Sequence, residues 1–383
     1  MLADYCVVPW KRGALAPRQA FANKKGLQPL QGNRIRIFNL CFLGFGNVNR
    51  TLVRLLEEKK QELQDHYNIS FHITGIASRR LGWIANPEGI GGAGDLARET
   101  SPESLDLASG NSLAPNISFW LAAARADVVF EATSLNVENG ESAISHIRAA
   151  LEYGAHAITA NKGPIVHAYR ELRDLAAKQG KRFLFESTVM DGVPIFSLFP
   201  QLPVIHLQGF HGILNSTTNV ILGEMEQGLS FDEALKKAQA LGVAETDATH
   251  DIDGWDAAVK TAALINVLML SGENDVPIRL DQIARDGIRD LTPQALRTAR
   301  RDGWAFKLVC RARRTSSSGS GGIEASVHPE KVRSNEPMAR INGTSSYIYF
   351  ETDIFPGLAI TEENPGLYAT AYGMLADFVR AVG

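Results

Sequence analysis

The first half of the chain alternates apolar runs with segments in which apolar residues recur at helical spacing. The apolar runs predict strands over residues 34–43, 69–78, 126–133, 155–160 and 182–188. The helical spacing predicts helices over residues 48–63, 141–152 and 166–178. Strands that alternate with helices are typical of a parallel sheet with helices on both faces. We therefore expect an α/β fold with a Rossmann-type doubly wound parallel sheet.

The pattern changes after Pro203, which indicates a second domain. The predicted elements are a long alternating strand over 204–214, helices over 219–227, 231–241 and 257–270, a strand over 345–353 and a helix over 368–382. The polar, glycine-rich residues 315–322 are expected to form an exposed hairpin tip or a linker. Together these elements predict an α+β domain with an open sheet.

Four segments are expected along the chain. Residues 1–33 lack a regular pattern and are expected to be a disordered extension, and residues 34–161 are expected to form a dinucleotide-binding domain. Residues 162–325 are expected to form the catalytic and dimerisation domain. Residues 326–383 are expected to return to the nucleotide domain, with the last helix packed on it.

Composition and charge restrict the possible partners. The 383 residues are 45% hydrophobic and 21% charged, with a net charge of −3, which gives no basic surface for nucleic acid or anionic membranes. No apolar run reaches the roughly 20 residues that a membrane span needs. Cys6, Cys41 and Cys310 lie far apart and lack metal-ligand spacing, so we expect free thiols in a reducing, cytoplasmic environment.

A glycine turn between the first predicted strand and helix indicates nucleotide binding. Residues 44–49 read Gly-Phe-Gly-Asn-Val-Asn and keep the first two glycines of the dinucleotide fingerprint, with Asn49 in place of the third. The first glycine makes the turn, and the second lets the backbone approach a pyrophosphate at the helix N-terminus. The alternative is a plain tight turn.

The end of the second predicted strand bears on the choice of cofactor. An acid that binds the ribose 2′-hydroxyl of NAD is expected there, but the chain has Ser78, Arg79 and Arg80. Guanidinium groups suit a 2′-phosphate, which favours NADP and leaves NAD possible. The alternative is that both arginines are solvated surface residues.

The apolar helix near residue 260 carries charges that need an explanation. Asp253, Asp256 and Lys260 share one face of this helix. An exposed ion pair of this kind is common and contributes about 0.3–0.5 kcal/mol. The other interpretation is a functional lysine in a dry pocket, where burial lowers its pKa and Asp256 partly opposes that shift.

Four stretches in order resemble homoserine dehydrogenase from about Arg34 to the C-terminus. They are TANKGP (159–164), FESTVMDGVPI (185–195), GFHGILNSTTN (209–219) and LGVAETDATHDIDGWDAAVK (241–260). The resemblance implies NAD(P)H-dependent, reversible reduction of L-aspartate 4-semialdehyde to L-homoserine, a step in threonine, methionine and isoleucine biosynthesis. It also implies a homodimer, for which the strand at 204–214 is a candidate interface.

The resemblance also implies roles for particular residues. The catalytic residues would be Lys260, as proton donor, with Lys162 and Asp256. The substrate would be bound by Glu245, Asp251, Asp256, Lys162 and Thr217. The cofactor would be bound by Gly44, Phe45, Gly46, Asn47, Val48, Arg79, Thr133, Ser134, Lys162, Gly242 and Gly366. From the residues alone, Asn215, Thr217 and Thr218 could equally bind the substrate carboxylate or cap the next helix.

A monovalent cation, sodium, is a further implied ligand. The resemblance places it at Glu186, Val189, Asp191 and Val193, with the Glu186 carboxylate and backbone carbonyls as ligands. The chain departs from the family pattern at residues 363–367, where Glu-Asn-Pro-Gly-Leu replaces a Gly-Pro-Gly-Ala type loop. No C-terminal regulatory domain is expected after residue 383.

Two other functions remain as alternatives. Aspartate-semialdehyde dehydrogenase acts on the same aldehyde, but it needs a cysteine nucleophile, and no cysteine here has a suitable setting. A nucleotide-sensing module without catalysis would require Lys162 and Lys260 to be structural. Substitution of Lys260 distinguishes a sensor from an enzyme.

Overall fold

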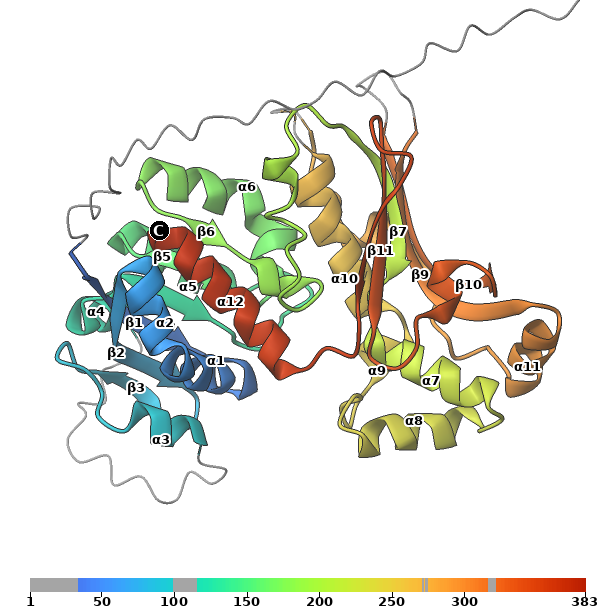
Figure 1. The fold of residues 1–383 in the computed structure, drawn as a ribbon, viewed down its shortest axis with the longest axis horizontal. Coiled ribbons are helices and arrows are strands. Elements are labelled where there is room, and N and C mark those ends of the chain that lie inside the picture. Colours follow the sequence, from blue (N-terminus) through green and yellow to red (C-terminus); the bar gives the residue numbers. More distant parts are fainter. Residues whose placement is uncertain (1–33, 99–115, 271, 273–274, 316–321) are drawn as a thin grey trace, which may run out of the picture.

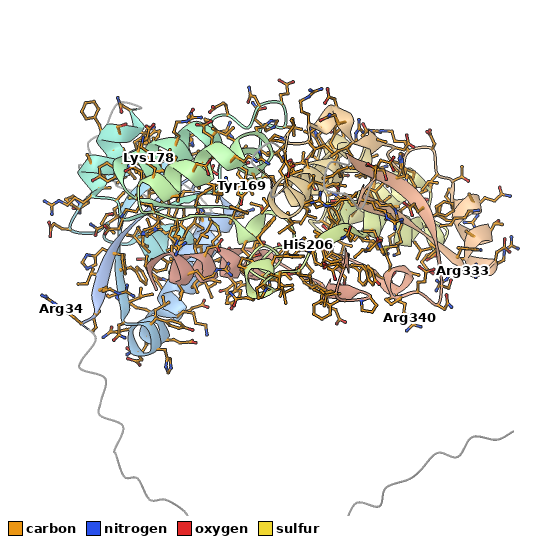
Figure 2. All side chains as sticks on the ribbon, turned by 90° about the horizontal axis from the view of Figure 1, so that it is seen from above. Arg34, Tyr169, Lys178, His206, Arg333 and Arg340 are labelled. Carbon is orange, nitrogen blue, oxygen red and sulfur yellow. The ribbon has the colours of Figure 1, made fainter. Side chains whose placement is uncertain are left out.

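A computed structural model describes residues 34–98, 116–270, 272, 275–315 and 322–383. The extension expected over residues 1–33 lies outside this part of the chain. The described elements form two halves, each built on its own sheet, and the halves lie side by side along the longest axis (Figure 1). Seen from above, Lys178 lies toward one end of the molecule and Arg333 and Arg340 toward the other (Figure 2). No described helix is long and apolar enough to cross a membrane.

The first sheet has the order β3-β2-β1-β4-β5-β6. Its strands are β1 (Arg36–Leu43), β2 (Ile69–Ser78), β3 (Gly82–Ala85), β4 (Val128–Glu131), β5 (His156–Thr159) and β6 (Phe183–Leu184). The accompanying helices are α1 (Asn47–Glu58), α2 (Lys60–Tyr67), α3 (Ala93–Arg98), α4 (Ile117–Ala124), α5 (Ala143–Tyr153) and α6 (Gly163–Lys178). All neighbours pair in parallel except β3, which is antiparallel to β2. The predicted doubly wound sheet is confirmed, while β3, α3 and α4 had not been predicted.

The second sheet has the order β12-β11-β7-β9-β10-β8. Its strands are β7 (Leu207–Ile213), β8 (Ala284–Arg285), β9 (Trp304–Arg314), β10 (Ile323–Arg333), β11 (Ser346–Thr352) and β12 (Leu358–Glu362). Its helices are α7 (Ser216–Glu226), α8 (Phe231–Ala240), α9 (Thr249–Ile252), α10 (Trp255–Leu264) and α11 (Pro293–Arg301), and one π turn covers Ile265–Met269. The expected α+β half with an open sheet is therefore present.

The glycine-rich stretch near residue 318 joins two strands. β9 and β10 pair in antiparallel register, and the Thr315 amide donates to the Gly322 carbonyl at 3.0 Å. This arrangement agrees with a hairpin tip, although residues 316–321 lie outside the described chain. The long strands on either side had not been predicted from the sequence.

Two of the expected domain boundaries do not coincide with the division of the chain between the two sheets. α6 and β6 belong to the first half, although the second domain was expected to begin at residue 162. Residue 325 lies inside β10, so no boundary falls there. The sheet to which a strand belongs depends on the strands with which it pairs. The composition of the segments around residues 162 and 325 did not show this pairing.

The last helix, α12 (Leu367–Val382), returns the chain to the first half (Figure 1). Its Met374 and Phe378 are fully buried and share a core with Phe42 and Phe130 of the first sheet. Phe378 meets the Phe130 ring edge-on, with centroids 6.0 Å apart. The chain thus crosses between the halves once after β6 and again after β12.

Candidate active site

The glycine turn after β1 has the geometry that a dinucleotide needs. Gly44 has a φ of +78°, and a Cβ there would lie 2.5 Å from the Ala132 carbonyl oxygen, so no larger residue fits. Gly46 is the N-cap of α1, and no described atom lies within 4 Å of where its Cβ would be. The space above Gly46 and the uncapped N-terminus of α1 therefore fit a pyrophosphate.

Asn49 explains how the turn is built without a third glycine. Its side chain is fully buried, and its Nδ2 donates to the carbonyls of Leu43, Gly44 and Phe130 at 3.0–3.4 Å. Asn49 thus joins the ends of β1 and β4 beneath the turn. Phe45 is buried and packs edge-on against Phe42, whereas Asn47 and Val48 begin α1 beside the open space.

The ends of β4 and β5 lie next to the glycine turn, because parallel strands end at one edge of a sheet. Glu131 is buried at the end of β4 and accepts hydrogen bonds from Thr133 and, at 2.6 Å, from Thr159. Burial raises the pKa of Glu131. This buried acid, which had not been predicted, fixes the segment with Thr133 and the exposed Ser134.

Lys162 follows β5 at the N-terminus of α6, and its side chain reaches Asp256 of α10 in the second half. Its Nζ lies 3.3 Å from Asp256 Oδ1, and Lys260 Nζ lies 3.1 Å from Asp256 Oδ2. Side-chain exposure is 20% for Lys162 and Asp256 and 16% for Lys260. Lys260 also donates to the Leu214 carbonyl at 2.6 Å. The structure therefore brings together two ammonium groups from different halves on one carboxylate.

Lys162, Asp256 and Lys260 form a charged triad, and its electrostatics differs in part from the expectation. Burial opposes the charged form of Asp256, but the ammonium groups of Lys260 and Lys162 outweigh it and hold the pKa of Asp256 below its usual range. Burial likewise opposes the ammonium of Lys260, yet Asp256 outweighs it and the pKa of Lys260 is raised. The expected lowering of this pKa is wrong, because the carboxylate lies in direct contact.

Asn215 connects the triad to α7. Its Nδ2 donates to Asp251 Oδ1 at 2.7 Å and to Asp256 Oδ2 at 3.1 Å, while its Oδ1 accepts from the Thr218 amide at 2.9 Å and caps α7. Burial and the nearby Asp256 raise the pKa of Asp251. Thr217 donates to the Val243 carbonyl at 3.2 Å. The expected cap of α7 is therefore made by Asn215, whereas Thr217 contacts the segment after α8.

Other expected site residues lie further out. Glu245 is exposed and makes no side-chain hydrogen bond or ion pair with the described chain. Gly242 has a φ of +71° in the exposed turn after α8, and Gly366 is the N-cap of α12. Asp253 pairs with Arg289 instead of Lys260. Arg79 and Arg80 are exposed in the turn between β2 and β3.

The residues at the expected cation site do not fit a role for the Glu186 side chain as a ligand. Glu186 is buried, and its carboxylate accepts from the amides of Phe196 (2.6 Å) and Ser197 (3.0 Å) and from Arg380 (3.0 Å). Both oxygens of this carboxylate therefore already accept hydrogen bonds from the chain itself, and Asp377 shares Arg380 with it. Among the described residues, no group of three His, Cys, Asp or Glu could hold a metal ion.

Asp191 and Glu362 form a second acidic group near Lys260. Asp191 accepts a hydrogen bond from Thr370 of α12, and its charge acts on both Lys260 and Glu362. Glu362 Oε2 is buried without a hydrogen-bond partner in the described chain. Burial, followed by Asp191, raises the pKa of Glu362 to about 7. Residue 362 had not been predicted, because an acid at the end of an edge strand has no sequence signature.

The described cysteines do not support thiol chemistry. Cys41 and Cys310 are free and buried, and burial raises their pKa to about 12 and about 11. Neither thiol can act as an activated nucleophile. The arrangement instead provides ammonium groups, which can protonate a developing alkoxide, beside a nucleotide-binding edge.

Comparisons with known proteins agree with this chemistry. The family model "Homoserine dehydrogenase, NAD binding domain" matches residues 44–186, and "Homoserine dehydrogenase" matches residues 194–379. An NAD(+)-dependent homoserine dehydrogenase from Pseudomonas canavaninivorans is 33% identical over 90% of this chain and 96% of its own length. A homoserine dehydrogenase from Methanocaldococcus jannaschii is 32% identical over 89% and 98%.

Solved structures show the same fold. The homoserine dehydrogenase from Thiobacillus denitrificans has a TM-score of 0.74 and 27% identity, covering 91% of this chain and 74% of that one. The Staphylococcus aureus homoserine dehydrogenase at pH 6.5 has a TM-score of 0.69 and 26% identity, covering 91% and 76%. Family models, relatives and solved structures therefore agree, and the chain belongs to the homoserine dehydrogenase family of oxidoreductases.

Proposed function

We propose that this chain catalyses the NAD(P)H-dependent, reversible reduction of L-aspartate 4-semialdehyde to L-homoserine, and so serves threonine, methionine and isoleucine biosynthesis. The observation that carries the proposal is the convergence of Lys162 and Lys260 on Asp256. This triad lies between the nucleotide-binding half and the second half. An amino-acid aldehyde needs such a setting, because its carbonyl must be protonated while hydride is delivered.

Each residue of the triad has a distinct role in the proposal. A bound nicotinamide supplies the hydride. Lys260, kept protonated by Asp256, donates a proton to the carbonyl oxygen as negative charge develops on it. Lys162 holds the substrate against the cofactor edge from the other side. Asp251 and Asp256 attract the substrate ammonium, since the two carboxylates lie close together on the same Asn215 amide.

The test of this proposal compares Lys260→Ala with Lys178→Ala, which removes an exposed lysine near the end of α6. We expect Lys260→Ala to lower kcat for homoserine oxidation by about 100-fold or more, with NADPH binding by fluorescence nearly unchanged. Lys178→Ala should retain both the kcat and the NADPH binding of the unaltered chain. A Lys260→Ala variant with normal turnover would overturn the proposal, and normal ligand response without turnover in the unaltered chain would favour a sensor.

For the cofactor, we propose NADP in preference to NAD. Arg79 and Arg80 follow β2, where no acid is present, and neither forms an ion pair with the described chain. Their guanidinium groups suit a 2′-phosphate. The P. canavaninivorans relative is named as NAD(+)-dependent, so the ratio of kcat/KM for the two cofactors is the deciding measurement. Arg79→Gln should lower the ratio of kcat/KM with NADP to kcat/KM with NAD, and an unchanged ratio would contradict the assignment of NADP.

For the assembly, we propose a homodimer through the outer face of the second sheet. Phe210, Ile348 and Phe350 are buried in the main core, so their strands β7 and β11 present alternate residues to the opposite face. His211 and Tyr349 stack on that face with ring centroids 4.9 Å apart. Light scattering of the full chain and of Tyr349→Glu tests this, because a charged residue at the interface should yield a monomer.

A further inference from the structure

Glu362, the last residue of β12, has a buried oxygen that no group satisfies. Its Oε2 is the one carboxylate atom among the buried side-chain atoms that lack a hydrogen-bond partner in the described chain. Such a group destabilises a fold, and buried acids are therefore usually paired. An acid that stays unpaired beside charged catalytic groups is a candidate for a part in the reaction.

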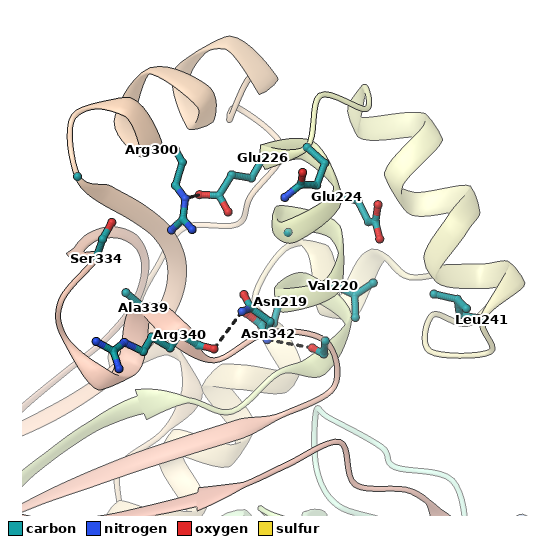
Figure 3. Close-up of a pocket in the computed structure, with 14 residues that line it drawn as sticks. Asn219, Val220, Glu224, Glu226, Leu241, Arg300, Ser334, Ala339, Arg340 and Asn342 are labelled. Atoms are coloured by element: carbon teal, nitrogen blue, oxygen red, sulfur yellow. Dashed lines mark hydrogen bonds and ion pairs between the residues drawn. The ribbon is translucent and has the colours of Figure 1, made fainter.

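The acids that line the cavity beside α7 are, in contrast, paired. This cavity has a volume of about 770 Å³ and lies between α7, the turn from α11 into β9 and the short helix Pro337–Arg340 (Figure 3). Glu226 lies 3.7 Å from Arg300, and Glu224 lies 2.7 Å from Lys237. The buried acid with unused hydrogen-bonding capacity is therefore Glu362.

The sheet register places Glu362 near Lys260. Glu362 pairs with Ser346 of β11, and the register between β11 and β7 continues to Leu214 on the other side of Ser346. Neighbouring strands lie about 5 Å apart, so the backbones of Glu362 and Leu214 are separated by about 10 Å. The Leu214 carbonyl accepts a hydrogen bond from Lys260 Nζ at 2.6 Å. The gap between the acid and the amine is therefore short enough for bridging water.

The Glu362 side chain points to the side of the sheet on which Lys260 lies. Alternate residues of a strand face the same side, and Leu358 and Ile360 of β12 pack against the main core. Leu214 and most of α10 belong to that same core. Glu362 continues the alternation and faces it too. The charge of Lys260 accordingly acts on Glu362.

Lys260 needs a base to which it can pass a proton. Its Nζ contacts the Leu214 carbonyl and Asp256, but a carbonyl is not a base at neutral pH, and Asp256 has a pKa below its usual range. The pKa of Lys260 is raised, so its proton leaves slowly to water, which is a far weaker base. Oxidation of homoserine leaves one proton on this amine in every turnover. A stronger acceptor than water is therefore required.

We propose that Glu362 exchanges the proton of Lys260 with solvent. In homoserine oxidation the hydroxyl proton passes to the Lys260 amine while the carbon loses its hydride. Lys260 then gives this proton, through water, to the Glu362 carboxylate, which releases it to solvent. Reduction of the aldehyde uses the same steps in reverse. Only O–H and N–H bonds form and break in this exchange, and it rests on the proposed function.

The setting of Glu362 suits this exchange. The residue is partly exposed, so it can contact solvent, while its Oε2 is buried on the side of the core. Burial and the charge of Asp191 raise its pKa to about 7, so near neutral pH it accepts and releases a proton with similar ease. Asp191 is itself held by a hydrogen bond from Thr370 of α12. The groups whose charges act on Glu362 are thus Asp191 and Lys260.

The test measures homoserine oxidation at pH 8 by the full chain with saturating NADP. Glu362→Gln should lower kcat about tenfold or more, with kcat/KM for homoserine nearly unchanged. The reason is that the exchange resets the free enzyme between turnovers, so it limits the rate only when substrate is plentiful. Glu363→Gln is the matched control, because it removes the neighbouring, exposed acid and should retain kcat.

Rescue by buffer separates proton exchange from a structural role. At constant ionic strength, rising imidazole should restore most of the kcat of Glu362→Gln, whereas a bulky buffer of similar pKa should restore little. The unaltered chain should respond to neither. Glu362→Ala repeats the measurement with the whole side chain removed, and Glu362→Asp, which keeps a carboxyl group, should retain most of kcat. A cooperative melting transition and normal NADPH binding identify the folded variants.

Each outcome decides the proposal. Folded Glu362→Gln and Glu362→Ala with normal kcat would overturn it, and so would a loss of kcat/KM that imidazole does not restore. An equal loss in Glu363→Gln would also overturn it, because the effect would then not belong to the buried acid. No turnover of homoserine by the unaltered chain would instead overturn the proposed function, and this inference with it.

Discussion

Asp256 is the residue that joins the two halves of the site, because its carboxylate pairs with the ammonium groups of both Lys162 and Lys260. We predict that Asp256→Asn lowers kcat by about 100-fold or more. Without the carboxylate the pKa of Lys260 falls, because burial lowers it and only the charges of Asp191 and Asp251 still oppose that shift. The rate of aldehyde reduction, which needs the protonated amine, should then begin to fall at a lower pH than in the unaltered chain. A pH profile of kcat in the reduction direction measures this.

Asp253→Asn is the control for this prediction. Asp253 lies one turn earlier and pairs with Arg289 instead of Lys162 or Lys260. Its loss should leave kcat and the pH profile unchanged. An equal effect of the two substitutions would show that the charge of Asp256 has no special role.

Glu362 predicts a dependence of stability on pH. Burial raises its pKa from 4.5 to about 7, so between these pH values the folded chain binds a proton that the unfolded chain has lost. Rising pH therefore lowers the free energy of unfolding through this group. Glu362→Gln does not titrate, so its Tm relative to the unaltered chain should increase from pH 4.5 to above 7. A constant difference in Tm across that range would contradict the prediction.

The sequence was sufficient to select candidate site residues where a motif specified them. It did not show how burial and contacts would change their pKa values. The spacing of Lys162, Asp256 and Lys260 within recognisable stretches was sufficient to name them. The direction of the Lys260 pKa was wrong, because it depends on a contact distance of 3.1 Å that no sequence displays. Glu362 was missed for the same reason, since its burial arises from segments distant in the chain.

At the scale of elements, α7 and α8 provide a matched pair of capped helices. Asn215 caps α7 and also binds Asp251 and Asp256, whereas Ser230 caps α8 in a capping box and lies away from the site. Asn215→Ala and Ser230→Ala should each lower the free energy of unfolding by about 1 kcal/mol, measured by urea denaturation. Only Asn215→Ala should also lower kcat.

The outcome that would contradict this prediction is an equal loss of activity in both variants. In that case α7 would act through overall stability, and the hydrogen bonds of Asn215 to Asp251 and Asp256 would have no separate effect. A Ser230→Ala variant with lower stability and full activity is therefore the informative control.

Elements with a regular pattern were predictable, and those defined by tertiary pairing were not. β1 and α8 have clear periodicity or caps, and their predicted and observed bounds agree within a few residues, whereas the single helix predicted over 48–63 is divided into α1 and α2 at Lys59. β9 and β10 are each 11 residues long and were not assigned, because charged residues interrupt their alternation. Arg311 and Glu330, for example, pair across these strands at 3.0 Å.

At the scale of the whole molecule, α12 joins the last part of the chain to the segment that leaves β6. A Cβ on Gly373 would lie 2.3 Å from Ser187 Oγ and 2.8 Å from Gly192 Cα. Ser187 Oγ donates to the Thr370 carbonyl at 2.6 Å, and the Glu186 amide donates to Asp377 at 2.8 Å. We predict that Gly373→Ala lowers the free energy of unfolding by about 1–3 kcal/mol, measured by urea denaturation.

Gly223→Ala makes the same change in α7, where no described atom lies within 4 Å of the added Cβ. There it should stabilise the chain by about 0.5–1 kcal/mol, since alanine favours a helix over glycine. Opposite signs for the two variants would support close packing at Gly373. If both substitutions raise the free energy of unfolding, residues 186–192 must shift to accommodate the added methyl group without destabilising the chain.

The same contact joins the segment that leaves β6 to the helix that returns the chain to the first half. Gly192 lies in the outgoing segment and Gly373 lies inside α12, and a Cβ on either residue would meet the backbone of the other segment. Because this contact lies where the connection to the second half begins, loss of α12 would remove a support of that connection as well as part of the first core.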